Sequence, residues 1–275
     1  MCSSRVGDVP EHVRFGPIVG RRVPIPNDAP PPRARDTVRG VVDWSVERST
    51  GSAAEFHARD ITDVASPTVW IHRVTRRALV LGSSQRADVV DLDAAERLDV
   101  EVCGRRSGGG LVLIEPDRSC WIDVLVQPDG GLWDDDVNRA FRWVGEVWRS
   151  ALASLAVADL RVHDGPLLHP EAGRFLCFAG LGPGEVVQVQ ERPGHDVEVA
   201  SKVVGLSQRR QRGVARFQGL FVSATDPVLT RSLVLRDAWP DGLDPSRVPV
   251  GTREEVDLDL LADRFLEALP DPAAT

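Results

Sequence analysis

The feature that most constrains the fold is a series of short β-rich segments interrupted by one long amphipathic helix. Over residues 133–155 apolar side chains recur at steps of three and four, which places them on one face of a helix. A second segment of this kind, over 257–269, is the last helix that we expect. Because the strands are not separated by regular helices, the pattern predicts an α+β fold in which two long helices cover one face of a sheet.

The β-rich segments run from residue 68 to residue 224. The first two, 68–74 and 78–82, are separated by a short polar link and are expected to form a hairpin. Two shorter helices are expected, one within 44–61 with Ser52 as its N-cap and one over 91–98. The remaining strands are predicted over 100–104, 111–115, 120–127, 174–180, 185–191, 197–208 and 215–224.

Charge and composition exclude several classes of protein. The formal charge of -8 argues against a protein that mainly binds a nucleic-acid backbone. No segment approaches the roughly 18 consecutive apolar residues of a membrane span. The four cysteines have no CxxC spacing and the first residues contain no apolar signal segment, so we expect a cytoplasmic protein. The six histidines lack HxxxH and HExxH spacing, so no metal site is expected.

The chain is expected to divide into three parts. Residues 1–37 are rich in proline, arginine and aspartate and show no helical or strand period, which indicates a flexible leader. Residues 38–225 hold the β-rich segments and the long helix. Residues 226–275 form a short C-terminal extension that ends in a helix.

A glycine-rich segment, RRSGGG at 105–110, lies between two predicted strands. Consecutive glycines allow a ligand to approach the backbone closely, and the N–H groups of such a turn can bind an anion. Arg105 and Arg106 supply forked donors that suit phosphate or carboxylate. The segment lacks the GxxxxGK[ST] and GxGxxG patterns of nucleotide-binding loops. A ligand-binding turn and a plain hairpin turn both remain open.

Lysine occurs at a single position of the chain. Of the 33 basic residues 32 are arginine, and the remaining one is Lys202, within KVVGLSQ. A GC-rich genome explains why lysine is rare but not why it persists at this position. A compact ammonium reaches into sites that are too tight for a guanidinium, which makes Lys202 a candidate functional residue. An ordinary surface lysine is the alternative.

Taken in order, these segments resemble the lipoate–protein ligase and octanoyltransferase family, whose members share a catalytic domain with biotin–protein ligases. The matching pieces are LGSSQ, RRSGGG, CFAG at 177–180 and KVVGLSQ at 202–208. The segments 130–148 and 176–186 look like the actinobacterial branch in particular. The resemblance covers roughly residues 38–225, so these residues are expected to form the catalytic domain.

The resemblance implies a fold and an activity. The fold is the class II synthetase-like one of this catalytic domain, with a mixed, mostly antiparallel sheet flanked by helices. The activity is that of a lipoate–protein ligase-like enzyme, which activates or transfers a lipoyl or octanoyl group to a lysine of a lipoyl carrier domain through an acyl-adenylate. Lys202 takes the role of the essential lysine, which contacts the acyl carbonyl and the α-phosphate.

The resemblance also implies binding residues, ligands and partners. A ligase of this type uses ATP with Mg²⁺ and has no tightly bound cofactor. The acid would be lipoate or octanoate, and the acceptor a lipoyl carrier domain of a 2-oxoacid dehydrogenase or a glycine cleavage protein. Neither nucleic acid nor membrane is expected as a partner. Substrate and nucleotide contacts are expected from Arg105, Arg106, Ser107, Gly108, Gly109, Gly110, Gly205, Ser207, Gln208, Gln218, Gly82 and Gln85.

The chain departs from the family pattern in ways that leave two alternatives open. Gln218 stands where ligases of the family usually carry a histidine, and the segment after the glycine turn lacks the usual His and Asn. Octanoyltransferases of this superfamily hold the acyl group as a thioester, without ATP, and Cys177 is the candidate nucleophile for that reaction. A cysteine that only packs in a strand is the alternative for this residue. A non-catalytic paralogue could instead bind the acyl ligand or the carrier domain.

Overall fold

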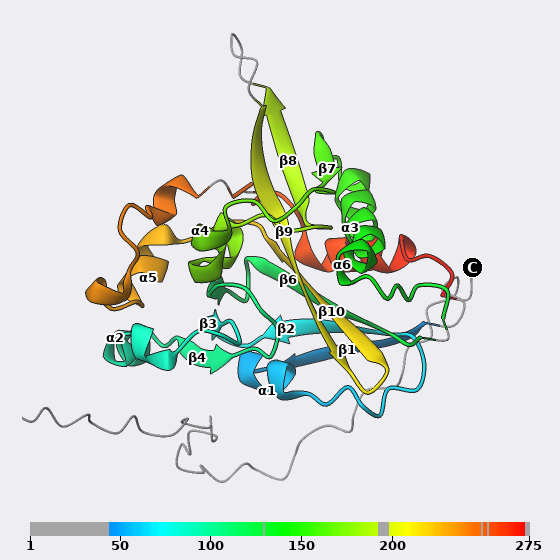
Figure 1. Ribbon diagram of the computed structural model, residues 1–275, viewed down its shortest axis with the longest axis horizontal. Coiled ribbons are helices and arrows are strands. Elements are labelled where there is room, and N and C mark those ends of the chain that lie inside the picture. The colour runs from blue at the N-terminus through cyan, green and yellow to red at the C-terminus, as the bar shows by residue number, and fades with distance from the viewer. Residues whose placement is uncertain (1–43, 129, 192–197, 249, 252, 273–275) are drawn as a thin grey trace, which may run out of the picture. The chain divides into compact units, whose positions relative to one another are not determined.

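The computed structural model describes residues 44–128, 130–191, 198–248, 250–251 and 253–272 (Figure 1). The predicted leader over 1–37 lies outside these residues.

A seven-stranded sheet forms the centre of the fold. Its first two strands pair in parallel and every other neighbouring pair is antiparallel, which confirms the predicted mixed, mostly antiparallel sheet. In spatial order its strands are β1 (Ser45–Gly51), β2 (Thr68–Val74), β6 (Ser119–Val126), β10 (Val214–Val222), β9 (Glu198–Gln211), β8 (Val186–Glu191) and β7 (Leu160–Val162).

A second sheet has three strands in the order β4 (Glu101–Gly104), β3 (Ala78–Leu81) and β5 (Val112–Ile114). The predicted hairpin between β2 and β3 is therefore wrong. Both edges of β2 are already paired with β1 and β6, so the chain leaves the large sheet after β2 and β3 pairs with β4 and β5.

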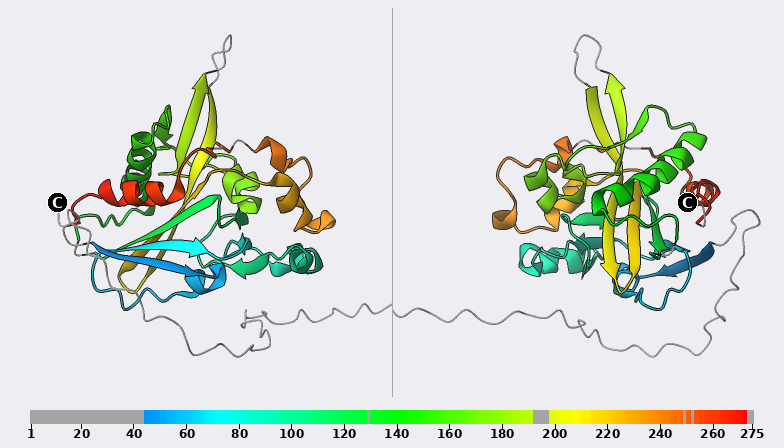
Figure 2. Two further views of the ribbon diagram at one scale, coloured as in Figure 1. Left: turned by 180° about the vertical axis from the view of Figure 1, so that it is seen from behind. Right: turned by 45° about the vertical axis from the view of Figure 1, so that its right-hand side comes forward.

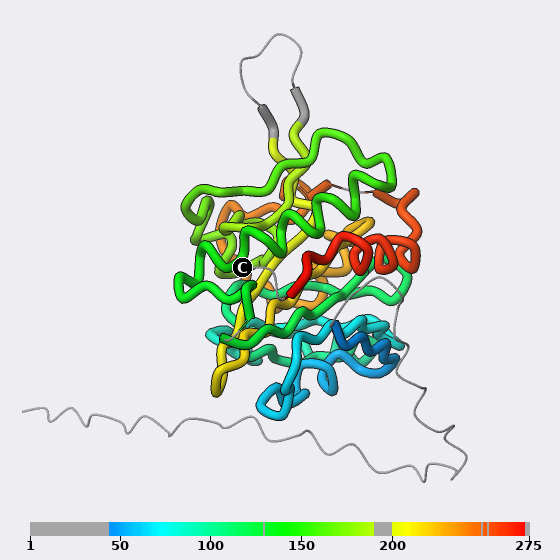
Figure 3. Tube along the Cα trace, turned by 90° about the vertical axis from the view of Figure 1, so that its right-hand side faces the viewer, coloured from blue at the N-terminus to red at the C-terminus, as the bar shows by residue number. Residues whose placement is uncertain are grey.

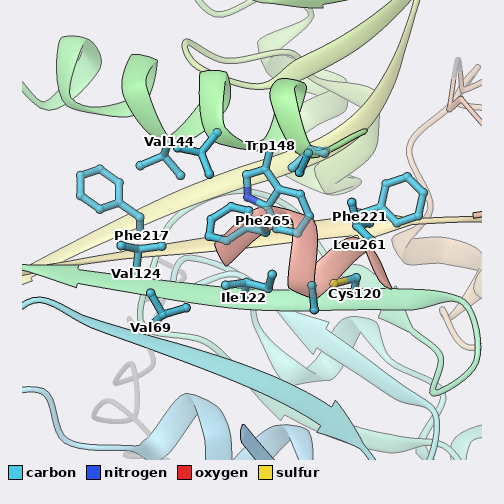
Figure 4. Packing of buried hydrophobic residues seen from close by; sticks show 14 of the residues in the cluster. Val69, Cys120, Ile122, Val124, Val144, Trp148, Phe217, Phe221, Leu261 and Phe265 are labelled. Atoms are coloured by element: carbon cyan, nitrogen blue, oxygen red, sulfur yellow. The ribbon is translucent and has the colours of Figure 1, made fainter. Parts of the chain in front are cut away.

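Two helices cover one face of the large sheet, as predicted. The helices α3 (Val137–Ser154) and α6 (Leu258–Glu267) lie side by side against the strands (Figure 3). Trp148 of α3 is fully buried, and its ring centroid lies 4.7 Å from that of Phe265 of α6. Beneath them Ile122 and Phe217 rise from the sheet (Figure 4). Burial of these apolar surfaces fixes α6 to the main core.

The remaining helices lie near the small sheet, on the other side of the molecule from α3 (Figures 1 and 2). A second apolar cluster joins the small sheet to α4 and to the segment around α5 through Leu79, Leu111, Leu176 and Leu233. These short elements are α1 (Ala53–Ala58), α2 (Leu92–Arg97), α4 (Pro170–Phe175), α5 (Pro227–Ser232), and the 3₁₀ turns η1 (Ala87–Val89), η2 (Cys177–Ala179), η3 (Arg236–Ala238) and η4 (Pro245–Arg247).

Two further expectations are wrong. Residues 45–51 form the edge strand β1, and only 53–58 are helical, although Ser52 is the predicted N-cap and forms a capping box with Glu55. Residues 174–180 form no strand: α4 ends at Phe175 and η2 follows. None of the helices in the described ranges is both long and apolar enough to cross a membrane. The division of the chain at residue 225 stays a prediction.

Candidate active site

The glycine-rich segment is held in shape by its own first arginine. The Arg105 guanidinium is buried and donates from Nε and Nη2 to Gly108 O, at 3.2 and 3.0 Å. Nη2 also donates to Gly110 O at 2.7 Å. Because β3 lies between β4 and β5, the segment is not the turn of a hairpin, which removes the simpler interpretation. Arg106, by contrast, is exposed.

The LGSSQ segment packs directly under this turn. Ser83 N donates to Ser107 O at 3.0 Å. A Cβ at Gly82 would lie 1.8 Å from Gly109 O, so only glycine allows the two backbones to approach this closely. Gln85 then accepts from Gly82 N at 3.0 Å and donates to a backbone carbonyl of α4. Gly82 and Gln85 therefore shape the turn from below.

Lys202 lies near the start of β9 with only 4% of its surface exposed. Its Nζ donates to Cys177 O at 2.9 Å and to Gly180 O at 3.1 Å, and it forms an ion pair with Glu185 Oε1 at 2.6 Å. The ammonium also lies 5.0 Å from the centroid of the Phe178 ring. All three N–H donors of the only lysine are thus engaged.

Glu185 is a residue that the sequence analysis missed. It is buried, accepts from Gly182 N at 2.7 Å and from Leu206 N at 3.1 Å, and pairs with Lys202. The only signal in the sequence was its place after the LGPG turn, directly before β8. Nothing in the local pattern indicates that this carboxylate faces a strand 17 residues later.

A chain of polar side chains links the glycine turn to the large sheet. Ser107 Oγ lies 3.0 Å from Ser207 Oγ of β9 and donates to Gln218 Oε1 of β10 at 3.1 Å. Gln218 Nε2 in turn lies 3.3 Å from His57 Nδ1 of α1. Burial lowers the pKa of His57 to about 3, so its ring is neutral at physiological pH. His57 was not predicted, because it is far from every motif in the sequence.

His57, Ser207 and Gln218 of this chain line an apolar pocket, which we call the acyl pocket. Five of the predicted site residues line it: Arg105, Cys177, Gly205, Ser207 and Gln218. The remaining lining residues are His57, Val80, Val112, Ile114, Trp121, Phe178, Leu206, Gly219 and Leu220.

A second pocket adjoins the first and is called the polar-rimmed pocket here. The two pockets share Val112 and Phe178. The second is formed by β5, the end of β10 and the segment 224–250. It contains apolar side chains together with the polar residues Glu115, Ser119, Thr225, Asp226 and Thr230.

Beneath the acyl pocket lies a buried ionic cluster centred on Asp123 of β6. Arg216 donates to its Oδ2 from Nε at 2.8 Å, and His72 Nε2 lies 2.9 Å from the same atom. Trp121 Nε1 donates to Oδ1 at 2.8 Å. Burial alone would raise the pKa of Asp123, but Arg216 and His72 outweigh burial and hold that pKa well below its usual range. The cluster anchors Trp121, which lines the pocket.

The nine other predicted site residues line neither pocket: Gly82, Gln85, Arg106, Ser107, Gly108, Gly109, Gly110, Lys202 and Gln208. Arg106 lies on the outer side of the turn near Arg209, whose pKa is lowered by burial and by the charge of Arg106. Gln208 is partly buried, and its amide atoms find no hydrogen-bond partner among the described residues. No group of three His, Cys, Asp or Glu side chains suited to a metal ion occurs in the part of the chain that the structure describes.

Comparison with solved structures shows where this fold occurs. A bipartite lipoate protein ligase from Thermoplasma acidophilum, described with its E2 lipoyl domain, is 17% identical and gives a TM-score of 0.60 over 82% of this chain and 81% of its own. A putative lipoate protein ligase from the same organism, with bound lipoic acid, gives 0.58 at 17% identity over 81% of each chain. A lipoate-protein ligase A bound with ATP gives 0.57 at 17% identity over 82% and 83%.

Sequence comparison gives the family. No curated protein matches the chain in sequence. The sequence pattern of the lipoyl protein ligase A/B catalytic domain, however, matches residues 53–266, which include the glycine turn, both pockets and Lys202. The chain therefore belongs to the lipoyl protein ligase A/B catalytic domain family.

Proposed function

We propose that this protein is a lipoate–protein ligase-like enzyme, which activates lipoate or octanoate as an acyl-adenylate and transfers the acyl group to a lysine of a lipoyl carrier domain. One observation carries the proposal: two adjoining pockets meet at Phe178, and the ammonium of Lys202 lies over that ring. An acyl-adenylate has an apolar chain and a nucleotide joined by a charged linkage. Two pockets that meet beside a cation match such a molecule.

The acyl chain would occupy the acyl pocket, to which Val80, Ile114 and Leu220 give an apolar wall. A relative of the same fold has been solved with lipoic acid, which supports this assignment.

The nucleotide would occupy the polar-rimmed pocket, and the relative solved with ATP supports ATP as the cosubstrate. Glu115 and Asp226 are the carboxylates of this pocket. One or two carboxylates beside nucleotide phosphates are a usual setting for Mg²⁺. These two residues would hold it if Glu115 exchanged its ion pair with Arg77, and Asp226 its bond from Leu229 N, for the cation. Bound there, the cation would neutralise phosphate charge.

Lys202 would act where the two pockets meet. The acid attacks the α-phosphorus and pyrophosphate leaves; the carrier amine then attacks the acyl carbon, loses a proton and releases AMP. Negative charge develops on phosphate oxygen in the first step and on the acyl oxygen in the second. A buried ammonium stabilises both, after exchanging a backbone carbonyl partner for the ligand oxygen. Loss of one such donor typically costs about 10²–10³ in rate.

The test is incubation of the purified protein with ATP, Mg²⁺, lipoate or octanoate and a lipoyl domain, followed by intact-mass analysis. We expect the lipoyl domain to gain one acyl group only when ATP and the acid are both present. Lys202→Ala should slow this about 100-fold or more. Full activity in Lys202→Ala would reject the role of the lysine.

A thioester route is the second candidate, because Cys177 lines the acyl pocket. In that route the thiolate attacks an acyl thioester of a carrier protein, and the carrier thiol leaves. Incubation with an octanoyl carrier protein and no ATP tests it. An acyl adduct that is lost in Cys177→Ser supports the route. Binding of acid or carrier without any mass change would support a non-catalytic role.

Several finer expectations stay predictions. The acceptor would be a carrier domain of a 2-oxoacid dehydrogenase or of a glycine cleavage protein, in the cytoplasm. The similarity to the actinobacterial branch rests on the segments 130–148 and 176–186 alone.

A further inference from the structure

Two arginines beside the acyl pocket have no carboxylate partner among the described residues. Arg106 is exposed and follows Arg105 at the start of the glycine turn. Arg209 of β9 is partly buried, and in the part of the chain that the structure describes its guanidinium donates only to the side chain of Gln211. We call Arg106 and Arg209 the arginine pair.

Arginines on neighbouring strands of the large sheet are paired. Arg48 of β1 forms an ion pair with Asp263. Arg73 of β2 forms one with Asp259. Because the whole chain has a formal charge of -8, carboxylates are in excess, and the lack of a partner at the arginine pair is not a matter of composition.

The sheet places the arginine pair next to the acyl pocket. Successive residues of a strand alternate between its two faces, so Arg209 lies on the same face as Ser207, which lines that pocket. The two positions are about 7 Å apart along the strand. Ser207 Oγ lies 3.0 Å from Ser107 Oγ, and Ser107 directly follows Arg106. Arg106 and Arg209 therefore flank the contact between the glycine turn and β9.

The arginine pair brings like charges together. Burial and the charges of Arg106 and Arg216 lower the pKa of Arg209, and the charge of Asp60 offsets them only in part. A bound anion would relieve this repulsion. The forked donors of guanidinium groups suit both carboxylate and phosphate.

The location of the arginine pair favours a carboxylate of a protein over the phosphate of a nucleotide. Neither arginine lines the acyl pocket or the polar-rimmed pocket. The pocket proposed for the nucleotide contains no residue of the glycine turn and none of β9. A protein acceptor, by contrast, has to contact the surface around the pockets in order to bring its amine to the acyl carbon.

We propose that the arginine pair docks an acidic face of the carrier domain that accepts the acyl group. The proposal rests on the function proposed above and names the surface by which that partner is recognised. Exposed cations of this kind steer an acidic partner and set its orientation. Arg209 is a docking residue and takes no part in forming the acyl-adenylate.

The test measures binding of a lipoyl domain that carries carboxylates beside its acceptor lysine. Surface plasmon resonance on the full-length protein gives the Kd without any turnover. In Arg209→Glu attraction becomes repulsion, so we expect the Kd to rise about 10-fold or more. Raising the salt from about 0.05 to 0.3 M should weaken binding to the unmodified protein and reduce the difference between the two.

Two further variants assign the effect to the arginine pair. Arg142→Glu makes the same change of charge on α3, where Arg142 is exposed and pairs with Asp164, and should change the Kd by less than about 2-fold. Arg209→Gln removes the charge without reversing it and should raise the Kd by a smaller factor than Arg209→Glu. Circular dichroism shows whether each variant folds, and Arg209→Gln carries the test if Arg209→Glu does not.

Exchange of pyrophosphate into ATP, measured without the carrier, separates this inference from the proposed function. We expect the exchange to be unchanged in Arg209→Glu. An unchanged Kd in Arg209→Glu, or no binding of the domain to a protein that is active in exchange, would overturn the inference alone. A higher KM for ATP with an unchanged Kd would mean that the arginine pair holds phosphate, which also overturns it.

The proposed function can fail by itself as well. If the domain binds through Arg209 but no acid-dependent exchange occurs, the adenylate mechanism is wrong and the docking surface stands. If neither binding nor exchange is seen, both are wrong.

Discussion

Lys202 keeps its place because Glu185 compensates its charge. An ammonium with 4% of its surface exposed would be strongly destabilising without a counter-ion. Glu185 is held in turn by the N–H groups of Gly182 and Leu206. Glu185 is therefore a positioning residue, since it holds the ammonium beside Phe178, which lines both pockets.

Replacing Glu185 by glutamine should lower the free energy of unfolding, because the Lys202 ammonium loses its counter-ion. Glu185→Gln keeps the size of the side chain but leaves the buried ammonium without its counter-ion, which typically costs about 3–5 kcal/mol of stability. Denaturant unfolding measures the loss. Glu146→Gln is the control, because Glu146 pairs with Arg149 on the surface and should cost under about 1 kcal/mol. Equal midpoints for the two variants would contradict the positioning role.

His57 should make the stability of the protein depend on pH. Its pKa is about 3 in the folded protein against 6.5 for a free side chain. On acidification the unfolded chain takes up the proton of His57 at a higher pH than the folded protein does. The contribution of His57 to the free energy of unfolding is therefore complete above pH 6.5 and is lost as the pH drops toward 3. Near pH 4.5 the loss due to His57 is on the order of 2–3 kcal/mol.

Unfolding of the unmodified protein and of His57→Phe between pH 7 and about 4.5 measures this contribution. The depressed pKa of Asp123 adds its own loss only at lower pH, because that carboxyl is deprotonated in both states above about 4. If both proteins lose stability equally over this interval, His57 is not held neutral by burial.

At the scale of elements, the glycine turn depends on its contact with the end of β3. Gly82→Ala would drive a methyl group into Gly109 O, so we expect a loss of about 1–3 kcal/mol of stability and of acid binding. Gly108→Ala is the matched control in the same turn, because a Cβ there meets no atom within 4 Å. Equal effects of the two substitutions would contradict the close packing of the turn on Gly82.

The helix α6 should contribute to the main core. Phe265 is fully buried against Trp148, so Phe265→Ala should lower the free energy of unfolding by about 3–5 kcal/mol. Leu260→Ala on the exposed side of the same helix should change it far less. A small effect of Phe265→Ala in denaturant unfolding would mean that the C-terminal extension is not part of the core.

The sequence predicted most elements but not their pairing. Alternating and continuous apolar runs identified β2, β3, β6 and β10, since burial imposes those patterns. The sequence does not show that β3 leaves the large sheet, because strand pairing depends on which strand edges are already hydrogen-bonded to another strand. The edge strand β1 lacks an apolar period, with exposed Glu47 and Arg48, and was therefore assigned to a helix.

At the scale of the whole molecule, the site is assembled from segments that lie far apart in the chain. The glycine turn and the lysine strand could be predicted, because their composition is unusual locally. His57, Trp121 and Glu185 could not, since each is ordinary in its own segment and becomes part of the site only through the fold. The junction of two pockets at Phe178 is likewise a property of the folded chain.

The most direct test of acyl-adenylate formation at this junction is isotope exchange between pyrophosphate and ATP, measured without any carrier domain. We expect exchange that requires lipoate or another medium-chain acid and that falls about 100-fold or more in Lys202→Ala. Absence of acid-dependent exchange, in a protein that still acylates a lipoyl domain from an acyl carrier protein, would contradict an adenylate mechanism and point to Cys177.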